Sequence, residues 1–131
     1  MVRAGRPDLI TKIILSRPGA NRVAACRNVR ASANARSILS AAVSMTVVRD
    51  QVRDPIIALG GVSGHVMRLA SVEKELNGKP LPGADEIQAL VSAAVRPAAT
   101  LAGSAAFRKY QAGVVVALAL REALRQKGGR G

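Results

Sequence analysis

The sequence predicts an α+β fold, in which a small antiparallel β-sheet of three to four strands is covered by about three helices. Apolar residues of the first half fall in β-branched runs with period-2 stretches, whereas those of the second half recur every three or four positions. The chain has 131 residues, of which 49% are hydrophobic, so a packed core in a single domain is expected. Because only 2% are aromatic, Ala, Val, Leu and Ile must build this core.

The first predicted strand is residues 9–15, which are rich in Ile and Leu and end at a turn cluster containing Pro18 and Gly19. Residues 22–29 form the second. Its two faces alternate imperfectly: Val23, Ala25, Arg27 and Val29 fall on one side, and Arg22, Ala24, Cys26 and Asn28 on the other.

Residues 37–48 form a longer apolar stretch, in which Val43, Met45 and Val47 have the spacing of a strand. The Ala-rich start of this stretch leaves a helix as the alternative. A short polar link, 49–51, separates the stretch from residues 56–59, and two apolar runs joined in this way suggest an antiparallel hairpin.

Helices follow the glycine-rich segment 60–64. The first predicted helix buries residues at three-to-four spacing, Val66, Leu69, Val72, Glu73 and Leu76, and it ends at Asn77 and Gly78. A second helix starts at Ala84 or Asp85 and ends or kinks at Pro97.

The last predicted helix begins after Ser104, which can cap its first turn. Its expected apolar stripe comprises Phe107, Tyr110, Val114, Ala117, Leu118 and Leu124, and its polar side comprises Arg108, Lys109, Arg121 and Arg125. The whole chain, 1–131, is read as one domain with an ordered core at about residues 8–124 and tails at 1–7 and 126–131.

Charge is concentrated at one end of the chain. The net charge is +12, and residues 1–36, with eight basic side chains and one acid, Asp8, account for +7 of it. Such a field attracts nucleic acid, anionic lipid or an acidic protein without distinguishing them, and no recognisable nucleic-acid-binding module accompanies it.

Targeting and membrane signals are absent from the sequence pattern. The polar residues 1–7 lack the apolar stretch of a secretory signal, and the longest apolar or glycine run, 112–120, is far short of the ~20 residues that cross a bilayer. One cysteine, Cys26, excludes an internal disulfide and fits a reducing compartment. We therefore expect a soluble, cytoplasmic protein with no membrane partner.

No catalytic or metal site is predicted. His65 is the only histidine and lies in a glycine-rich turn, where a surface role is the simpler reading. The eight acids are dispersed, and the close pairs Glu73 with Glu75 and Asp85 with Glu86 would point to different helix faces. Cys26 is read as a small buried filler on a strand. The loop 60–64 matches neither phosphate-binding glycine pattern, so a tight turn is the default.

Five segments nevertheless resemble, in order, one known family. Residues 56–62 (IIALGGV) look like the "IALGGV" strand end in the C-terminal domain of the FAD-binding subunit of molybdenum hydroxylases, the carbon monoxide dehydrogenase and xanthine dehydrogenase family. DLITKIIL at 8–15 is similar to "ELITxIxLP", and SAAVSMTV at 40–47 to "VSxAVxLxL". EKELNGKPL at 73–81 is similar to "EAxLxGKPL", and GSAAFRKY at 103–110 to "ASAxYRRxL".

The resemblance implies an oxidoreductase complex and a small sheet covered by helices. In this family a molybdenum-cofactor subunit oxidises the substrate, an iron–sulfur subunit relays electrons, and the FAD subunit passes them to an acceptor. The flavin is held mostly by preceding domains, through "AGGTDL"-like segments that this chain lacks, so independent FAD binding is not expected. The family often places a Lys near the flavin on the strand after the Pro-Gly turn. The matching position here is Arg27, or Asn28 if the register slips by one.

The resemblance thus implies a non-catalytic part of an FAD-binding subunit, which packs against the flavin-binding domain and the molybdenum-cofactor and iron–sulfur subunits. FAD is the implied cofactor of the parent subunit, and Arg27 is its expected contact in this chain. The alternative is a small basic nucleic-acid-binding protein. Against it, Phe107 and Tyr110 are expected on the apolar stripe of the last helix, which leaves no platform for base stacking.

Overall fold

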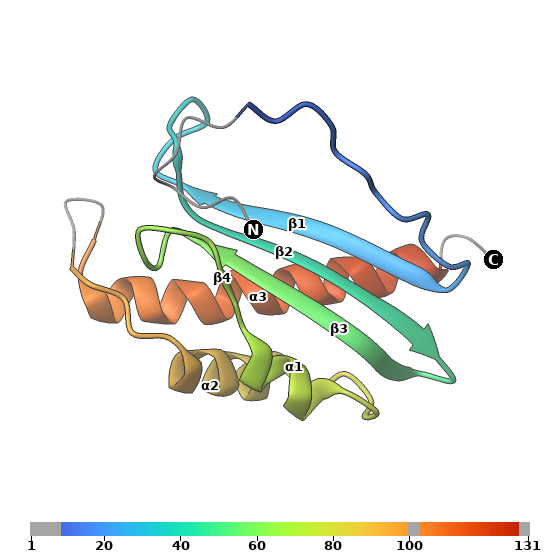
Figure 1. Ribbon diagram of the computed structural model, residues 1–131. Helices are drawn as coiled ribbons and strands as arrows, with labels where there is room; N and C mark the ends of the chain where they lie inside the picture. Colours follow the sequence, from blue (N-terminus) through green and yellow to red (C-terminus); the bar gives the residue numbers. More distant parts are fainter. Residues whose placement is uncertain (1–8, 100–102, 129–131) are drawn as a thin grey trace.

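The computed structural model describes residues 9–99 and 103–128, and the α+β prediction is confirmed (Figure 1). The strands β1 (Arg22–Arg30), β2 (Ser37–Val48), β3 (Gln51–Gly60) and β4 (Met67–Arg68) form one antiparallel sheet in the order β1-β2-β3-β4. The helices are α1 (Ala70–Leu76), α2 (Ala84–Ala94) and α3 (Ala105–Gly128). The helix α3 runs on past residue 126, where the sequence predicts a tail, and the predicted tail 1–7 lies outside the described residues.

Side-chain alternation in β1 and β2 separates a covered face of the sheet from an open one. Val23 of β1 and Leu39, Val43 and Val47 of β2 are buried, and α3 packs across both strands on that side. The predicted alternation of residues 22–29 is therefore confirmed. The stretch 37–48 is a strand along its whole length, because its β-branched residues pack well on a pleated surface. The helical alternative for its Ala-rich start is wrong.

The predicted hairpin joins β2 to β3. Its turn residues Arg49 and Asp50 have φ values of 47° and 63°, as a two-residue type I′ turn requires. The strand β3 also contains a bulge: Ser44 pairs with Ile56 and Thr46 with Arg53, so Asp54 and Pro55 together oppose Met45. The bulge accommodates a proline, which cannot donate to the ladder, inside a strand longer than the predicted 56–59.

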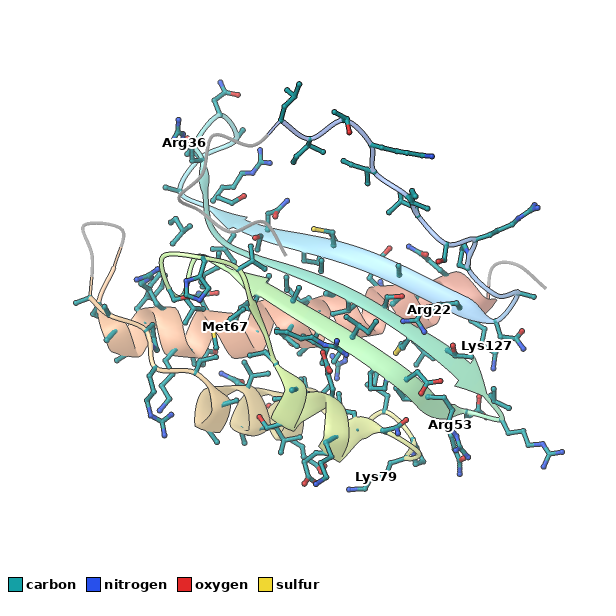
Figure 2. The ribbon with its side chains drawn as sticks, in the orientation of Figure 1. Arg22, Arg36, Arg53, Met67, Lys79 and Lys127 are labelled. Carbon is teal, nitrogen blue, oxygen red and sulfur yellow. The ribbon has the colours of Figure 1, made fainter. Side chains whose placement is uncertain are left out.

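The predicted strand at residues 9–15 is wrong. This segment has no regular structure, and Leu9, Ile10, Ile13, Ile14 and Leu15 are 60–87% exposed. In Figure 1 it runs beside the sheet as the dark blue trace before β1, and Figure 2 shows its side chains as sticks along that trace. A strand needs a hydrogen-bonding partner, and no described residue pairs with this segment.

The first helix starts later than predicted, at Ala70, because the short strand β4 occupies residues 67–68. Val66 is consequently 67% exposed, while Leu69, Val72 and Leu76 are buried as expected. Gly78 has a φ of +80°, which explains why the chain turns away there. The second helix has the predicted bounds, with Val95 following it and Pro97 just beyond.

The apolar stripe predicted for the last helix is correct only in part: Ala117 is buried, and Val114 and Leu124 are partly buried. Phe107, Tyr110 and Leu118 are 43–57% exposed, and the buried face of α3 instead comprises Arg108, Ala112, Gly113, Val115, Val116, Ala117, Ala119, Leu120 and Ala123. Small residues on this face allow close packing: a Cβ at Gly113 would lie 2.9 Å from Cα of Gln88 in α2. The predicted cap is confirmed, since the N–H of Phe107 donates to Oγ of Ser104 at 3.1 Å.

Arg108, expected on the polar side of α3, is buried. One of its terminal nitrogens donates to the carbonyl oxygen of Ala98 at 2.6 Å, which ties the start of the helix to the segment after α2. This hydrogen bond offsets part of the cost of burying a guanidinium group.

Candidate functional site

One face of the sheet is left uncovered by the described helices. On it lie Ala24 and Cys26 of β1, Ala42 and Ser44 of β2, and Ile56 and Ala58 of β3, which the strand register places side by side. They line a shallow cavity of about 500 Å³. Almost every one of these side chains is small, so the face is flat and presents mainly apolar atoms.

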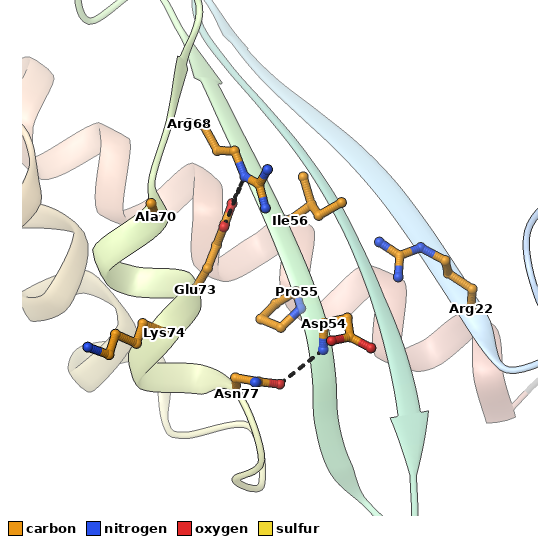
Figure 3. A pocket seen from close by; sticks show the side chains of 9 residues that line it. All are labelled: Arg22, Asp54, Pro55, Ile56, Arg68, Ala70, Glu73, Lys74 and Asn77. Atoms are coloured by element: carbon orange, nitrogen blue, oxygen red, sulfur yellow. Dashed lines mark hydrogen bonds and ion pairs between the residues drawn. The ribbon is translucent and has the colours of Figure 1, made fainter. Parts of the chain in front are cut away.

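A second, more polar cavity of about 370 Å³ lies where the open face meets α1 (Figure 3). Arg22, Ile56 and Arg68 bound it from the sheet, and Glu73, Lys74 and Asn77 bound it from α1 and the residue after it. Asp54, from the bulge in β3, lies at its lower edge. Three basic and two acidic residues therefore line the cavity, although the Lys74 side chain extends away from it in Figure 3.

Glu73 organises this corner of the domain. Its side chain is almost completely buried, and Oε1 accepts the backbone N–H of Ile57 at 2.8 Å. Nε of Arg68 donates to both carboxylate oxygens, at 2.8 and 3.0 Å. This hydrogen bond and the Coulomb attraction to Glu73 raise the pKa of Arg68 above its ordinary value. The carboxylate thus fills a gap in the outer edge of β3 beyond the short strand β4.

The rest of that edge is also occupied. The backbone N–H of Asp54, which has a φ of 47°, donates to Oδ1 of Asn77 at 3.0 Å. Nearer the hairpin, Val52 exchanges backbone hydrogen bonds with Gly78 and Lys79 at 2.7 and 2.9 Å. Covering an edge strand in this way keeps it from pairing with other chains.

The sequence pattern predicted Glu73 only as part of a buried helical stripe and assigned no role to Arg68. Burial of Glu73 and exposure of Glu75 confirm that the pair points to different faces of α1. An acidic residue, Glu73, at a position where the helical pattern expects an apolar one was the sequence signal for this site. Its partners come from β3 and β4, so their identity depended on the tertiary fold.

Arg27 lies on the helix side of β1 rather than on the open face. One terminal nitrogen donates to Oε2 of Glu122 in α3 at 2.7 Å, and the side chain remains 49% exposed. Asn28, the alternative position, is on the open face and exposed. The two candidate flavin contacts therefore face opposite sides of the sheet.

Cys26 and His65 are both exposed. The interpretation of Cys26 as a buried filler is wrong, because it lies on the open face, which no helix covers among the described residues. The carbonyl of His65 accepts a hydrogen bond from Oγ of Ser63 at 2.8 Å within the loop before β4. In the described part of the chain no group of three or more His, Cys, Asp or Glu is arranged to hold a metal ion.

The loop after β3 is the predicted tight turn. Gly61 has a φ of +88°, and a Cβ there would overlap the carbonyl oxygen of Ile38. The loop leads into β4 and not directly into a helix, contrary to expectation. Its backbone is packed against β2, which leaves no cradle for a phosphate at Gly61.

The comparison with protein families decides between the hypotheses. The family model described as the CO dehydrogenase flavoprotein C-terminal domain matches residues 24–123. The chain belongs to this CO dehydrogenase flavoprotein C-terminal domain family. The resemblance read from the five sequence segments is confirmed, and the nucleic-acid-binding alternative is not favoured.

Curated and solved relatives agree with this family. The protein YgfM of Escherichia coli K12 is 38% identical over 110 residues, which are 83% of this chain and 38% of YgfM. Carbon monoxide dehydrogenase from Hydrogenophaga pseudoflava, in a form lacking the Mo-pyranopterin moiety, has a TM-score of 0.74 at 26% identity, over 82% of this chain and 38% of that one.

Two further solved structures share the fold of this domain family. Reconstituted CO dehydrogenase from Oligotropha carboxidovorans matches with a TM-score of 0.73 at 25% identity, over 81% of this chain and 38% of that one. Quinoline 2-oxidoreductase from Pseudomonas putida 86 matches with a TM-score of 0.72 at 15% identity, over the same shares, and shows the fold alone. The chain therefore spans a little over a third of the length of these relatives.

The exposure of Phe107 and Tyr110 corrects one reason given against nucleic acid. Both rings are accessible on α3, so burial does not remove them as stacking platforms. The family match, and not the placement of the aromatic residues, is what disfavours that alternative.

The described residues offer hydrogen-bond donors of a kind that suits a flavin. Arg27 keeps guanidinium donors beyond the one that Glu122 accepts, and such donors suit a carbonyl or ring nitrogen. Gly61, which lies in the glycine-rich loop, packs directly on Ile38.

No described helix is long and apolar enough to cross a membrane.

Proposed function

We propose that this chain works as a docking domain of an FAD-binding subunit in a molybdenum-hydroxylase-type oxidoreductase, with no catalysis of its own. The observation that carries the proposal is the family match over residues 24–123. The partners are the flavin-binding domain and the molybdenum-cofactor and iron–sulfur subunits of one electron-transfer complex. The single, unpaired Cys26 supports a cytoplasmic location, and residues 1–131 are taken as one domain.

The exposed aliphatic segment 9–15 supports docking. Five large aliphatic side chains exposed within seven residues are unfavourable in water, and such patches mark protein-binding surfaces. The segment has the composition of a strand but no partner strand among the described residues. We infer that it packs on the flavin-binding domain, where burial would stabilise it by about 25 cal/mol per Å² of apolar surface.

Within this proposal, Arg27 is the flavin-side residue. Its side chain extends from β1 beside α3 and is half exposed, and its ion pair with Glu122 fixes the direction of its guanidinium group. A fixed guanidinium offers donors at low entropic cost, which suits a contact with a flavin that another domain holds.

Retention of FAD tests whether the chain only docks. We expect the purified chain, mixed with FAD and desalted, to lose the flavin, because the described residues supply one contact and no phosphate-holding loop. Flavin absorbance of the protein fraction measures the outcome. Stoichiometric FAD after desalting would contradict the docking-only function.

Charged residues in segment 9–15 should separate docking from folding. The free energy of unfolding of the double variant Ile13→Asp, Ile14→Asp should stay within about 0.5 kcal/mol of that of the original chain, because both side chains are already exposed. When the tagged chain is purified natively together with its flavin-binding partner, the flavin that the partner brings should fall by about tenfold or more, since two charges would have to be buried at the interface. Val66→Asp, at an exposed aliphatic residue outside the segment, is the control. Equal losses in both variants would remove segment 9–15 from the interface.

A further inference from the structure

Two arginines from distant strands face each other across Ile56 on the open face. Arg22 comes from β1 and Arg68 from β4, and both guanidinium groups extend toward the 370 Å³ cavity beside Ile56 (Figure 3). The register explains their approach, since Ser44 pairs with Ala24 and Ile56, and Ala58 pairs with Arg68. Residues 46 positions apart in sequence thus share one cavity.

Each guanidinium group is oriented through its Nε atom. Nε of Arg22 donates to Oγ of Ser44 at 2.9 Å, and Nε of Arg68 donates to the buried carboxylate of Glu73 at 2.8 Å. These hydrogen bonds leave the terminal nitrogens to point into the cavity. One terminal nitrogen of Arg22 makes a long contact of 3.5 Å with Thr46, and those of Arg68 have no hydrogen-bond acceptor among the described residues.

Free guanidinium donors, and not net charge, favour an anion in this cavity. The Glu73 carboxylate is occupied by its hydrogen bonds with Ile57 and Arg68, and Asp54 is the other acid that lines the cavity. In Figure 3 the Lys74 side chain extends away from Ile56 and Asp54, so the positive charges that face the cavity are those of Arg22 and Arg68. Paired guanidinium forks at fixed orientation are the donors that phosphate and carboxylate oxygens prefer.

We propose that the cavity between Arg22 and Arg68 binds the phosphate or carboxylate group of a small molecule. The adjoining cavity, lined by Ala24, Ala42 and Ala58, meets it at Ile56 and offers an apolar floor for the body of that ligand. The ligand class is therefore an oxyanion carried on a flat apolar group. This site belongs to the chain's own surface and goes beyond the docking function, which does not need it.

Titration of the isolated full chain tests the site without any partner or FAD. The probes are inorganic phosphate, phenyl phosphate, acetate and benzoate at constant ionic strength, with the arginine Nε–H resonances followed by NMR. The resonances of Arg22 and Arg68 should shift saturably, and phenyl phosphate should bind more tightly than phosphate because its ring covers the apolar floor. Tighter binding of the phosphates would identify a phosphorylated ligand, and tighter binding of the carboxylates a carboxylated one.

Arg22→Gln should weaken binding of phenyl phosphate by about tenfold, the loss expected for a charge-assisted hydrogen bond. Arg121→Gln, at an exposed arginine of α3, should leave it unchanged and is the matched control. Arg22→Lys keeps the positive charge but loses the planar guanidinium group, so it should bind phenyl phosphate with intermediate strength. This variant replaces Arg22→Gln in the test if the glutamine variant does not fold. Equal affinities for all four proteins, or small shifts spread over every arginine, would overturn the proposal.

Discussion

Replacement of Glu73 by alanine should lower the free energy of unfolding by about 3 kcal/mol, measured by urea denaturation. The carboxylate is buried and accepts the N–H of Ile57, a residue with no exposed surface. Without it, this backbone donor stays buried and unsatisfied at the edge of β3. The variant should also release Arg68, whose Nε is held by the same carboxylate. Loss of stability at this one position would show that the corner between β3, β4 and α1 depends on a single acid.

Two other variants isolate the cause of this loss. Glu73→Gln keeps an oxygen that can accept from Ile57, so its loss should fall between those of the original chain and Glu73→Ala. Glu75→Ala removes an exposed acid of the same helix, 3.3 Å from Lys79, and should cost less than about 0.5 kcal/mol. Similar losses for Glu73→Ala and Glu75→Ala would disprove the role given to the buried carboxylate.

Gly61→Ala should destabilise the domain by about 3 kcal/mol or prevent its folding. An alanine at a φ of +88° is strained, and its Cβ would overlap the carbonyl oxygen of Ile38. Because that oxygen belongs to the central strand β2, relief of the overlap requires a shift of the sheet itself.

Gly64→Ala in the same loop provides the matched control. No atom lies within 4 Å of the Cβ that it would add. Its effect should stay within about 0.5 kcal/mol, with a slight gain from reduced freedom of the unfolded chain. Urea denaturation of both variants measures the difference. A small effect of Gly61→Ala would mean that the loop can move away from β2.

The local sequence pattern correctly predicted those strands and helices that are determined by their own residues. Period-2 alternation was sufficient for β1 and β2, because one face of each strand is buried against α3. Proline, glycine and capping signals gave the bounds of α2 and the start of α3. The β-rich segment 9–15 failed, because composition alone does not supply the neighbouring strand that a sheet requires.

The buried face of α3 and the candidate sites depended on packing that no local pattern encodes. Small residues make close packing possible on that face: Gly113 and several alanines pack inward together with Leu120, while Phe107 and Tyr110 remain outside. Arg22 and Arg68 line the same cavity because of the order of the four strands in the sheet. Arg27 could be predicted only through the family resemblance, and its partner Glu122 came from a helix 95 residues away in sequence.

The central claim is that this chain serves as a docking domain of a flavoprotein in a molybdenum-containing complex. Native purification of the tagged chain from the organism that makes it tests this claim most directly, with FAD, molybdenum and iron measured in the eluate and the co-purifying proteins identified by mass spectrometry. We expect FAD, molybdenum and iron to elute together with the chain and with a protein carrying a flavin-binding domain. A chain that elutes alone, or with nucleic acid and without any of the three, would contradict the claim.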